Sequence, residues 1–328
     1  MKILIVIPLL FILSSCIRED DFYYRFSHQQ HGYLDTVIDF IAYARTEEEF
    51  DSFVNILIAE IARLHMLFNT FEPYENNLYM LNRNGYLEDA ASEIIDLLIA
   101  SKEAYEISKG RLNIAIGSVT NLWRKHGQNS PPTLPSLSEL HEANQSTNIE
   151  HIIIKENYVR LDDKNMRLDV GAFAKAFTMY LATNKLIEET NIPSFLLNVG
   201  GDLIAHKAPL SPNRDTWTVG ITNPIEPERS LPMSVPINSA SFFTSGDYRR
   251  FFTVDEENFS HIIDPFTLFP GNYFRSVNVI HENILIAETL TTALFLMPIE
   301  EGINLAEEFG ARVLWIDIEG RIIRTENF

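Results

Sequence analysis

Phe195-Leu196-Leu197-Asn198-Val199 followed by Gly200-Gly201-Asp202 is the stretch that decides the fold, because it has the composition of a buried strand that ends at two glycines. Three more strand-like segments follow it before the next helical pattern, at residues 217–221, 249–254 and 276–280. Two others precede it, at 151–155 and 158–161. Since strands arrive in runs rather than in strict alternation with helices, the sequence predicts an α+β fold with mixed, largely antiparallel sheets and packed helices.

Helical periodicity predicts the remaining elements. Thr46-Glu47-Glu48-Glu49 has the spacing of a capping box, and apolar residues follow it at helical spacing as far as Phe68. A second helix is expected over residues 88–109, with Gly110 as its stop. Three more are expected near 172–189, 284–296 and 300–309, and the proline-rich segment 130–136 predicts a loop.

Composition limits the possible partners. The chain has 328 residues, 46% of them hydrophobic, which suffices for one large or two modest domains. It carries 26 Lys and Arg against 45 Asp and Glu, a formal charge of -19, which disfavours nucleic acid as a partner. An anionic substrate would need local basic groups, a helix N-terminus or a metal ion held by carboxylates. Cys16 is the single cysteine, so no intramolecular disulfide can form.

The N-terminus has the organisation of a secretory signal peptide. Met1-Lys2 precedes an apolar run over residues 3–13, and Leu13-Ser14-Ser15-Cys16 resembles a bacterial lipobox. This pattern predicts a lipoprotein signal peptide at 1–15, cleavage before Cys16, acylation of its thiol and a tether over 16–31. The chain would then be a membrane-anchored lipoprotein of the bacterial cell envelope, facing the periplasm or the cell exterior. The alternative is a buried N-terminal strand with an ordinary core cysteine.

The first candidate site segment is Asp169-Val-Gly-Ala-Phe-Ala-Lys175, where a strand ends in an acid and a helix begins with small residues. A helix N-terminus with a lysine one turn inside can bind an anion, and nearby oxygens can hold a hard cation. An Asp cap with a solvated lysine explains the same pattern.

Three further segments carry groups of this kind. The glycine pair after Asn198 could admit a ligand or form a bare hairpin. A polar turn, Ser245-Gly246-Asp247-Tyr248, precedes His261, which could be a general base or a structural histidine. Glu288 and Thr292 share one face of an apolar helix, either to hold a magnesium ion or to face solvent.

The order of these segments resembles one family, the ApbE family of FAD:protein FMN transferases. The matching motifs are Asp169-x-Gly-Ala-x-Ala-Lys175, Asn198-x-Gly-Gly-Asp202, Ser245-Gly-Asp-Tyr248, His261-Ile-Ile-Asp-Pro265 and Ala287-Glu-x-x-Thr-Thr-Ala293. Upstream, Gly32-Tyr-Leu-Asp-Thr36, Phe71-Glu-Pro-Tyr-Glu-Asn-Asn77 and Leu122-Trp123 are similar to that family's N-terminal half. The resemblance runs from about Gly32 to the last strand, so it implies one FAD-binding catalytic unit over 32–328 with an ApbE-like, T-fold-like architecture.

The resemblance implies an activity and a set of site residues. FMN would pass from FAD to a threonine or serine hydroxyl of an acceptor protein, such as a subunit of a membrane redox complex, with Mg²⁺ required and AMP released. The implied metal ligands are the carbonyl of Ala172, Glu288 and Thr292, and the implied catalytic residues are His261, Lys175 and Asp264. The implied FAD contacts are Asn77, Asp169, Gly171, Lys175, Asn198, Gly200, Gly201, Asp202, Ser245, Gly246, Asp247, Tyr248 and His261.

The chain departs from the family pattern at three places. Glu288 stands where the metal aspartate is usual, Ala176 follows Lys175 where glycine is usual, and Pro265-Phe266-Thr267-Leu268 replaces Pro-Arg-Thr-Gly. Two alternative functions therefore stay open. One is a magnesium-dependent FAD pyrophosphatase that yields FMN and AMP, and the other is an FAD-binding lipoprotein without turnover.

Overall fold

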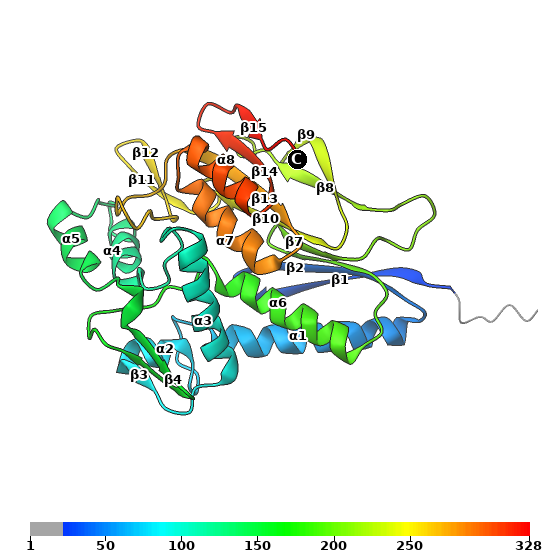
Figure 1. Ribbon diagram of the computed structural model, residues 1–328, viewed down its shortest axis with the longest axis horizontal. Helices are drawn as coiled ribbons and strands as arrows, with labels where there is room; N and C mark the ends of the chain where they lie inside the picture. Colours follow the sequence, from blue (N-terminus) through cyan, green and yellow to red (C-terminus); the bar gives the residue numbers. More distant parts are fainter. Residues whose placement is uncertain (1–21) are drawn as a thin grey trace, which may run out of the picture.

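The computed structural model describes residues 22–328 (Figure 1). The expected signal peptide and Cys16 lie outside the described residues. Within the described part, no helix combines the length and the apolar character that a membrane span requires.

An eight-stranded sheet forms the centre of the molecule, with the strand order β1-β2-β6-β7-β10-β13-β14-β15. Every pairing between its strands is antiparallel, as the runs of strands predicted. The sheet stays open, with β1 and β15 at its two edges. Its strands are β1 (Tyr24–Tyr33), β2 (Thr36–Ala44), β6 (Phe195–Val199), β7 (Asp202–His206), β10 (Ala240–Gly246), β13 (Phe274–His281), β14 (Arg312–Asp317) and β15 (Ile322–Arg324).

The N-terminal boundary of the domain lies earlier than the sequence predicted. A tether was expected over residues 16–31, but Tyr24 to Gln30 pair with β2, from Tyr24↔Ala44 to Gln30↔Ile38. Phe26 explains the difference, since its ring stacks on Phe50, in the helix α1 (Glu47–Leu67), with centroids 5.3 Å apart and so ties the strand to the core. The described part of the expected tether is therefore an edge strand.

Four helices cover one face of the sheet: α1 (Glu47–Leu67), α6 (Ala174–Glu189), α7 (Ile284–Phe295) and α8 (Ile299–Glu308) (Figure 1). The capping box is confirmed in part, because the Thr46 hydroxyl accepts from the Glu49 amide at 3.1 Å. Leu57 and Ile61 of α1 are fully buried together with Phe195 and Leu197 of β6, so the helical and strand periodicities meet in one core.

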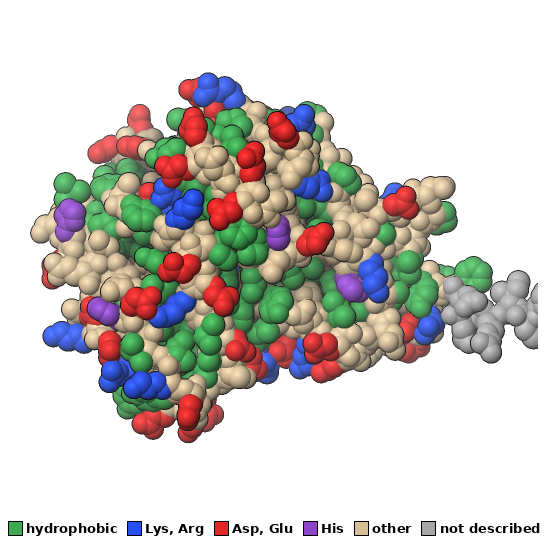
Figure 2. All heavy atoms as spheres, viewed as in Figure 1, with side chains coloured by type: hydrophobic (Ala, Val, Ile, Leu, Met, Phe, Trp, Pro, Cys, Tyr) green, Lys and Arg blue, Asp and Glu red, His purple; other side chains and the backbone are tan. Residues whose placement is uncertain are grey.

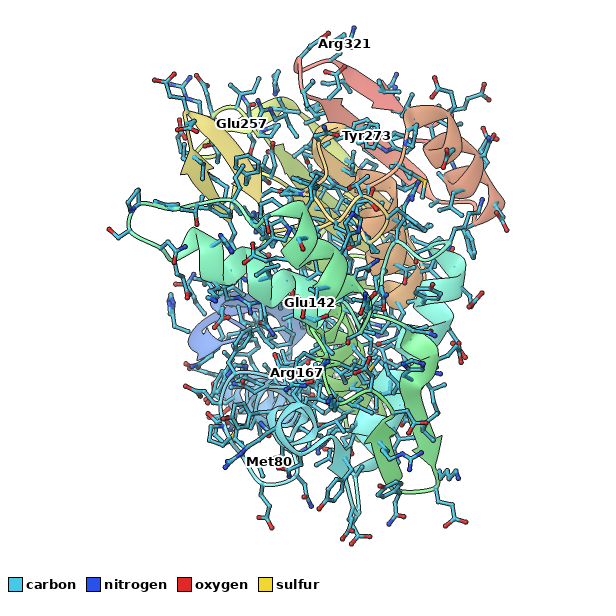
Figure 3. The ribbon with its side chains drawn as sticks, turned by 90° about the vertical axis from the view of Figure 1, so that its left-hand side faces the viewer. Met80, Glu142, Arg167, Glu257, Tyr273 and Arg321 are labelled. Carbon is cyan, nitrogen blue, oxygen red and sulfur yellow. The ribbon has the colours of Figure 1, made fainter. Side chains whose placement is uncertain are left out.

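A second lobe packs at one end of the helices. It contains α2 (Leu78–Asn84), α3 (Ser92–Ile107), α4 (Gly117–Gly127), α5 (Leu137–Asn144) and a small sheet of β3 (Tyr86–Leu87), β5 (Tyr158–Leu161) and β4 (Ile152–Lys155). Helix α3 begins later than the expected residue 88, because Asp89 has a left-handed φ of 53° and the Ala90 amide donates to the Asn157 carbonyl at 2.7 Å. Viewed from the side of this lobe, Met80 of α2 lies at one end and Glu257 at the other, with Arg167 between them (Figure 3).

Two hairpins complete the fold. The strands β8 (Trp217–Thr222) and β9 (Ser230–Ile237) pack on the sheet face opposite the helices, through a cluster that includes Val219, Phe242 and Ile316. The strands β11 (Phe251–Val254) and β12 (Glu257–Ser260) pack on Trp123 of α4.

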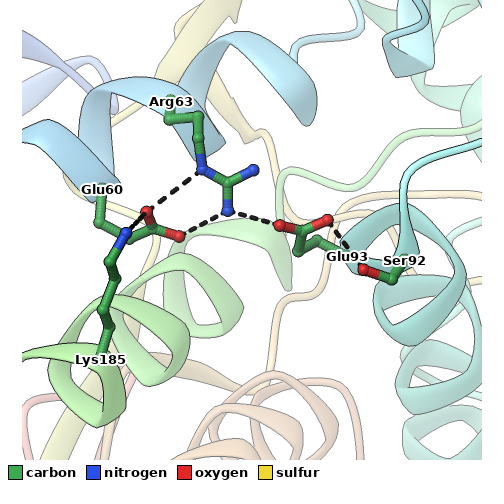
Figure 4. A network of polar contacts seen from close by, with 5 residues as sticks. All are labelled: Glu60, Arg63, Ser92, Glu93 and Lys185. Carbon is green, nitrogen blue, oxygen red and sulfur yellow. Dashed lines mark hydrogen bonds and ion pairs between the residues drawn. The ribbon is translucent and has the colours of Figure 1, made fainter. Parts of the chain in front are cut away.

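A buried glutamate connects three helices (Figure 4). Glu60 of α1 accepts from Arg63 at 2.6 Å and from Lys185 of α6 at 2.8 Å. Arg63 also pairs with Glu93 of α3 at 2.5 Å. Burial acts to raise the pKa of Glu60, but the hydrogen bonds from Arg63 and Lys185 outweigh it and hold the pKa below its usual value. The network ties α3 of the second lobe to the helices on the sheet.

The surface agrees with the charge balance of the sequence. On the face seen in Figure 2, acidic and basic side chains are interspersed among apolar ones. One surface pair, between Arg111 and Glu301 of α8 at 3.4 Å, joins the two lobes.

Candidate active site

The segment before α6 is held by backbone and amide contacts. Asn82 donates to the carbonyl of Leu168 at 2.9 Å and accepts from its amide at 2.7 Å. The amide of Asp169 donates to the Ile114 carbonyl at 2.8 Å. These contacts fix the chain immediately before the Gly171-Ala172 turn.

The carboxylate of Asp169 is fully engaged by protein donors. One oxygen accepts from the Gly171 amide at 3.0 Å. The other accepts from the Thr120 hydroxyl at 2.7 Å and from the Arg124 guanidinium at 3.4 Å. Asp169 therefore closes the turn before α6 and joins it to α4. It is not the N-cap of α6 that the capping alternative expected, because that position is Phe173, which has no side-chain cap.

Lys175, in the first turn of α6, is not a solvated lysine. Its Nζ forms an ion pair with Asp202 at the start of β7. Burial acts to lower the pKa of Lys175, but the charges of Asp202 and Glu288 exceed that effect and raise it. Lys175 therefore stays protonated. Asp202 is 3% exposed, and its second oxygen accepts from the Thr244 amide of β10 at 2.9 Å.

Glu288 of α7 is the third member of this cluster. It is 8% exposed, and no hydrogen bond reaches its carboxylate from the described residues. Burial raises its pKa to about 8, the charge of Asp202 acts in the same direction, and Lys175 partly opposes them. The solvent-facing alternative for this helix face is wrong, because Thr292 is also buried at 6% exposure.

The hydroxyl of Thr292 differs from those of its neighbours. Thr289 and Thr291 donate back to carbonyls one turn earlier, at 2.7 and 2.5 Å. Neither a donor nor an acceptor within hydrogen-bonding distance of the Thr292 hydroxyl occurs among residues 22–328. The oxygens of Thr292 and Glu288 are not sealed from solvent, so both are accessible to a further group.

The oxygens of Ala172, Glu288 and Thr292 are of the chemical types that bind a hard cation. Residues 22–328 contain no cluster of three or more His, Cys, Asp or Glu side chains able to hold a metal. The expected set has a different composition: one carboxylate from Glu288, one hydroxyl from Thr292 and the carbonyl of Ala172. In the described chain that carbonyl accepts no hydrogen bond from backbone or side chain, and Ala172 is exposed. Carboxylate, hydroxyl and carbonyl oxygens are ligands that Mg²⁺ accepts.

The glycine pair forms the β6–β7 hairpin. Val199 pairs with Asp202, and Gly200 and Gly201 have φ of 64° and 98°, as a two-residue turn of this type requires. A Cβ on Gly200 would lie 2.5 Å from the Thr36 hydroxyl. The glycines therefore form a hairpin, and the turn brings Asp202 back towards Lys175.

Arg249 covers this hairpin and was not anticipated. Its guanidinium donates to the carbonyl of Gly200 and lies against Gly201. Its charge also acts on Lys175. In the preceding motif, the Arg249 guanidinium lies over the Tyr248 ring, 5.8 Å from its centroid. Asp247 pairs with Arg275 at 2.9 Å, and burial raises the pKa of Asp247.

His261 lies on the open side of the site. Its side chain is exposed, and its Nδ1 lies 3.1 Å from the Arg250 carbonyl. The surrounding protein atoms desolvate the ring and lower its pKa, although the charge of Asp169 acts in the opposite direction. The imidazole is therefore neutral near neutral pH, which is the state a general base needs.

Comparison with known proteins identifies the family. The model described as the ApbE family matches residues 34–315. The chain belongs to the ApbE family. A protein named FAD:protein FMN transferase from Vibrio cholerae is 30% identical over 225 residues, which cover 67% of this chain and 66% of that protein. One of the same name from Escherichia coli (strain K12) is 26% identical over 236 residues, or 70% of this chain and 66% of that protein. These relatives are transferases, and the matched region is slightly under two thirds of their length.

Solved structures confirm the predicted fold class. The ApbE protein of Thermotoga maritima has a TM-score of 0.82 at 23% identity, covering 93% of this chain and 98% of that one. The flavin transferase ApbE from Vibrio cholerae has a TM-score of 0.78 at 20% identity, with 93% and 98% covered.

Two residues expected in the ApbE site, Asn77 and Asp264, use their side chains in hydrogen bonds to the protein backbone. Asn77 is fully buried as the N-cap of α2, where it accepts from Met80 and donates to three carbonyls, the nearest at 2.8 Å from Glu72. Asp264 accepts from the Phe266 amide at 2.9 Å and closes its own loop. Asn77 thus holds the segment between α1 and α2, and Asp264 holds the loop that follows His261.

The loop that departs from the ApbE pattern keeps its turn. Leu268 has φ of 65°, the left-handed conformation that glycine adopts freely, and its side chain is buried. Phe266 stands where the ApbE pattern has an arginine. Another cation lies close to this position, because the Arg111 guanidinium lies over the Phe266 ring, 5.1 Å from its centroid.

Sequence analysis missed the residues that support the ApbE motifs. Thr120 and Arg124 sit one turn apart on α4, and both reach Asp169. Their spacing of four residues is the one feature of the sequence that could have indicated a shared contact. Arg249 follows directly on Tyr248, so its proximity to a recognised motif was an available signal.

Proposed function

We propose that this chain transfers FMN from FAD to a threonine or serine hydroxyl of another protein and releases AMP. The observation that carries the proposal is the buried cluster of Lys175, Asp202 and Glu288 in a chain of the ApbE family. The names of its relatives supply the reaction. In that reaction the acceptor oxygen bonds to the FMN phosphorus, the bond from that phosphorus to the oxygen of AMP breaks, and the hydroxyl proton must go to a base.

The chain's own residues supply three functions. Lys175 is a permanent cation beside the helix N-terminus, where it binds and orients the pyrophosphate. Asp202 holds Lys175 in place. His261, neutral and accessible, takes the hydroxyl proton. The FAD contacts over Asn198–Asp202 and Ser245–Tyr248 belong to the same proposal.

Magnesium is part of the proposed function. Ala172, Glu288 and Thr292 would hold the ion, which would offset charge on the pyrophosphate oxygens when bound. The raised pKa of Glu288 supports this role, because a nearby dication is the group that would favour its ionised form.

One incubation separates the alternatives. The mature protein is mixed with FAD, magnesium and a candidate acceptor from a membrane redox complex, and the products are analysed by mass. We expect a flavinylated acceptor and an equal amount of AMP, both abolished by a chelator. Free FMN with AMP would instead identify an FAD pyrophosphatase, and intact bound FAD would identify a binding protein.

We also propose that the protein is exported and anchored in the cell envelope through a lipid on Cys16. The lipobox-like ending at Ser15-Cys16 supports this proposal. Cys16→Ser should yield soluble or uncleaved protein in cell fractionation. A variant that fractionates with membranes in processed form would contradict the anchor.

A further inference from the structure

The sheet face opposite the helices carries a groove that reaches the β6–β7 hairpin. Two adjoining hollows, of about 540 and 300 Å³, share Leu196, Asn198 and Leu203. The larger extends to Arg25 on the edge strand β1. The smaller extends to Arg249, which covers the β6–β7 hairpin.

The floor of the groove follows directly from strand register. Asp39 pairs with Gln29 and with Asn198, and Asn198 in turn pairs with Leu203. These four side chains form one row across β1, β2, β6 and β7. On β2, β6 and β7 the neighbouring residues, such as Phe40, Leu197 and Ile204, point to the helices, so the row itself lies on the uncovered face.

The wall of the groove has a free backbone edge. In the part of the chain that the structure describes, β8 pairs only with β9. Thr218 lies opposite Pro236, which has no N–H, so this pair is of the non-hydrogen-bonded kind. The amide and carbonyl of Thr218, and those of Gly220 two residues along, therefore point away from β9. Both residues line the groove.

The opposite edge of the hairpin is closed. Pro236 stands opposite Thr218 and removes an outward donor, and Pro232 removes another donor within the irregular pairing between Ser230 and Ser234. An extended peptide can therefore add to β8 and not to β9. The structure thus favours one side of the hairpin for strand addition.

Charge indicates what kind of peptide fits. In residues 22–328 neither Arg25 nor Arg249 forms an ion pair, and both are exposed at the two ends of the groove. The acid between them, Asp39, is already satisfied by Gln29 at 2.6 Å and Asn198 at 3.3 Å. On a chain of charge -19, this groove presents unpaired cations.

We propose that the groove binds an extended, acidic segment of the acceptor protein, paired to the free edge of β8, and leads its hydroxyl to the site beside Arg249. This proposal rests on the proposed transfer, since it names the surface that recognises the acceptor. The smaller hollow ends at Gly201, Thr244 and Arg249. Asp202 follows Gly201 directly, and its side chain pairs with Lys175, so the groove ends one residue from the catalytic cluster.

Two dye-labelled peptides test the proposal. Each carries one central threonine, flanked by aspartates in one and by lysines in the other. We expect the wild-type protein to bind the aspartate peptide at least about tenfold more tightly, with an affinity that falls as salt rises. Equal binding of both peptides would overturn the groove assignment.

Matched variants locate the binding. Arg25→Glu should weaken the aspartate peptide roughly threefold to tenfold, whereas Arg324→Glu on the opposite edge strand should leave it unchanged. Thr218→Pro removes an outward N–H that the ladder does not use, so it should weaken the peptide without lowering the melting temperature, and Thr218→Val should not weaken it.

The outcomes separate the groove from the reaction. Charge-selective binding without FMN transfer would leave the groove in place and contradict the proposed function. FMN transfer without charge-selective peptide binding would support the proposed function and contradict the groove proposal. A changed affinity for FAD in Arg25→Glu would assign the groove to the donor and overturn the proposal.

Discussion

The indole N–H of Trp123 on α4 donates to the carbonyl of Leu268 at 2.8 Å, across 145 residues of sequence. Leu268 belongs to the loop that follows His261 and is closed by the bond from the Leu268 amide to the Asp264 carbonyl at 2.8 Å. The second lobe thereby fixes the strained loop beside the proposed base.

Trp123→Phe removes this donor and keeps an aromatic ring in place. The buried carbonyl loses its partner, so the free energy of unfolding should fall by about 1–3 kcal/mol, measured by denaturant titration. FMN transfer should fall as well. Trp217→Phe is the control, because it removes a similar bond, to the Lys207 carbonyl at 2.9 Å, outside this loop. Equal transfer by the two folded variants would contradict a role for the Trp123 contact.

Glu288→Gln keeps the shape of the side chain and removes its charge. We expect transfer to be lost while FAD still binds. Because the folded pKa of Glu288 is raised to about 8, the folded state holds a proton that the unfolded state releases above its ordinary pKa. Without magnesium, the wild type should therefore lose stability as pH rises from the ordinary glutamate value to about 8, and Glu288→Gln should not. Parallel melting curves for both proteins across that range would contradict the buried acid.

His261→Ala should retain FAD binding and lower transfer by roughly 10²–10⁴, the usual contribution of a general base. The lowered pKa of His261 also predicts the pH profile. The neutral form is active, so activity should fall only on the acid side of the ordinary histidine pKa. Single-turnover transfer and melting temperature are measured on the same preparation. A less stable variant whose folded fraction transfers normally would make His261 structural.

Glu60→Gln should destabilise the protein by about 1–3 kcal/mol, because Arg63 and Lys185 lose a buried partner. The folded pKa of Glu60 is depressed, so its stabilisation is present above the ordinary glutamate pKa and is lost as pH falls through the folded value. The difference between wild type and variant should therefore shrink on acidification. A constant difference in acid denaturation would show that packing, not charge, is responsible.

The sequence predicted the strands whose apolar pattern is clear and whose ends are marked by turn residues. Strand β5 spans Tyr158–Leu161 and β6 spans Phe195–Val199, as expected. Strand β2 was missed because its segment, from Thr36 to Ala44, is almost continuously apolar and has no alternation to detect. Strand β10 was missed because its end coincides with the Ser245-Gly246 motif, which has the composition of a turn.

The site was predictable in its parts and not in its pairings. Lys175 was expected at a helix N-terminus, yet its ion pair with Asp202 depends on how α6 packs against the start of β7. Glu60 lies among charged residues of α1, and the sequence contains no sign that Lys185 reaches it. Such contacts arise from tertiary packing, so spacing along the chain does not encode them.

Helix α6 carries Lys175 near one end and Lys185 ten residues later, about 15 Å along its axis. The first binds Asp202 and the second binds Glu60, so the helix is fixed at two points by opposite charges. A tilt of ~5° about the Glu60 contact would displace the Lys175 end by about 1.3 Å, and errors of about 1 Å can cost on the order of a hundredfold in rate. The position of Lys175, which is proposed to bind the FAD pyrophosphate, therefore depends partly on Glu60 of α1. Helix α1 contributes none of the proposed catalytic groups.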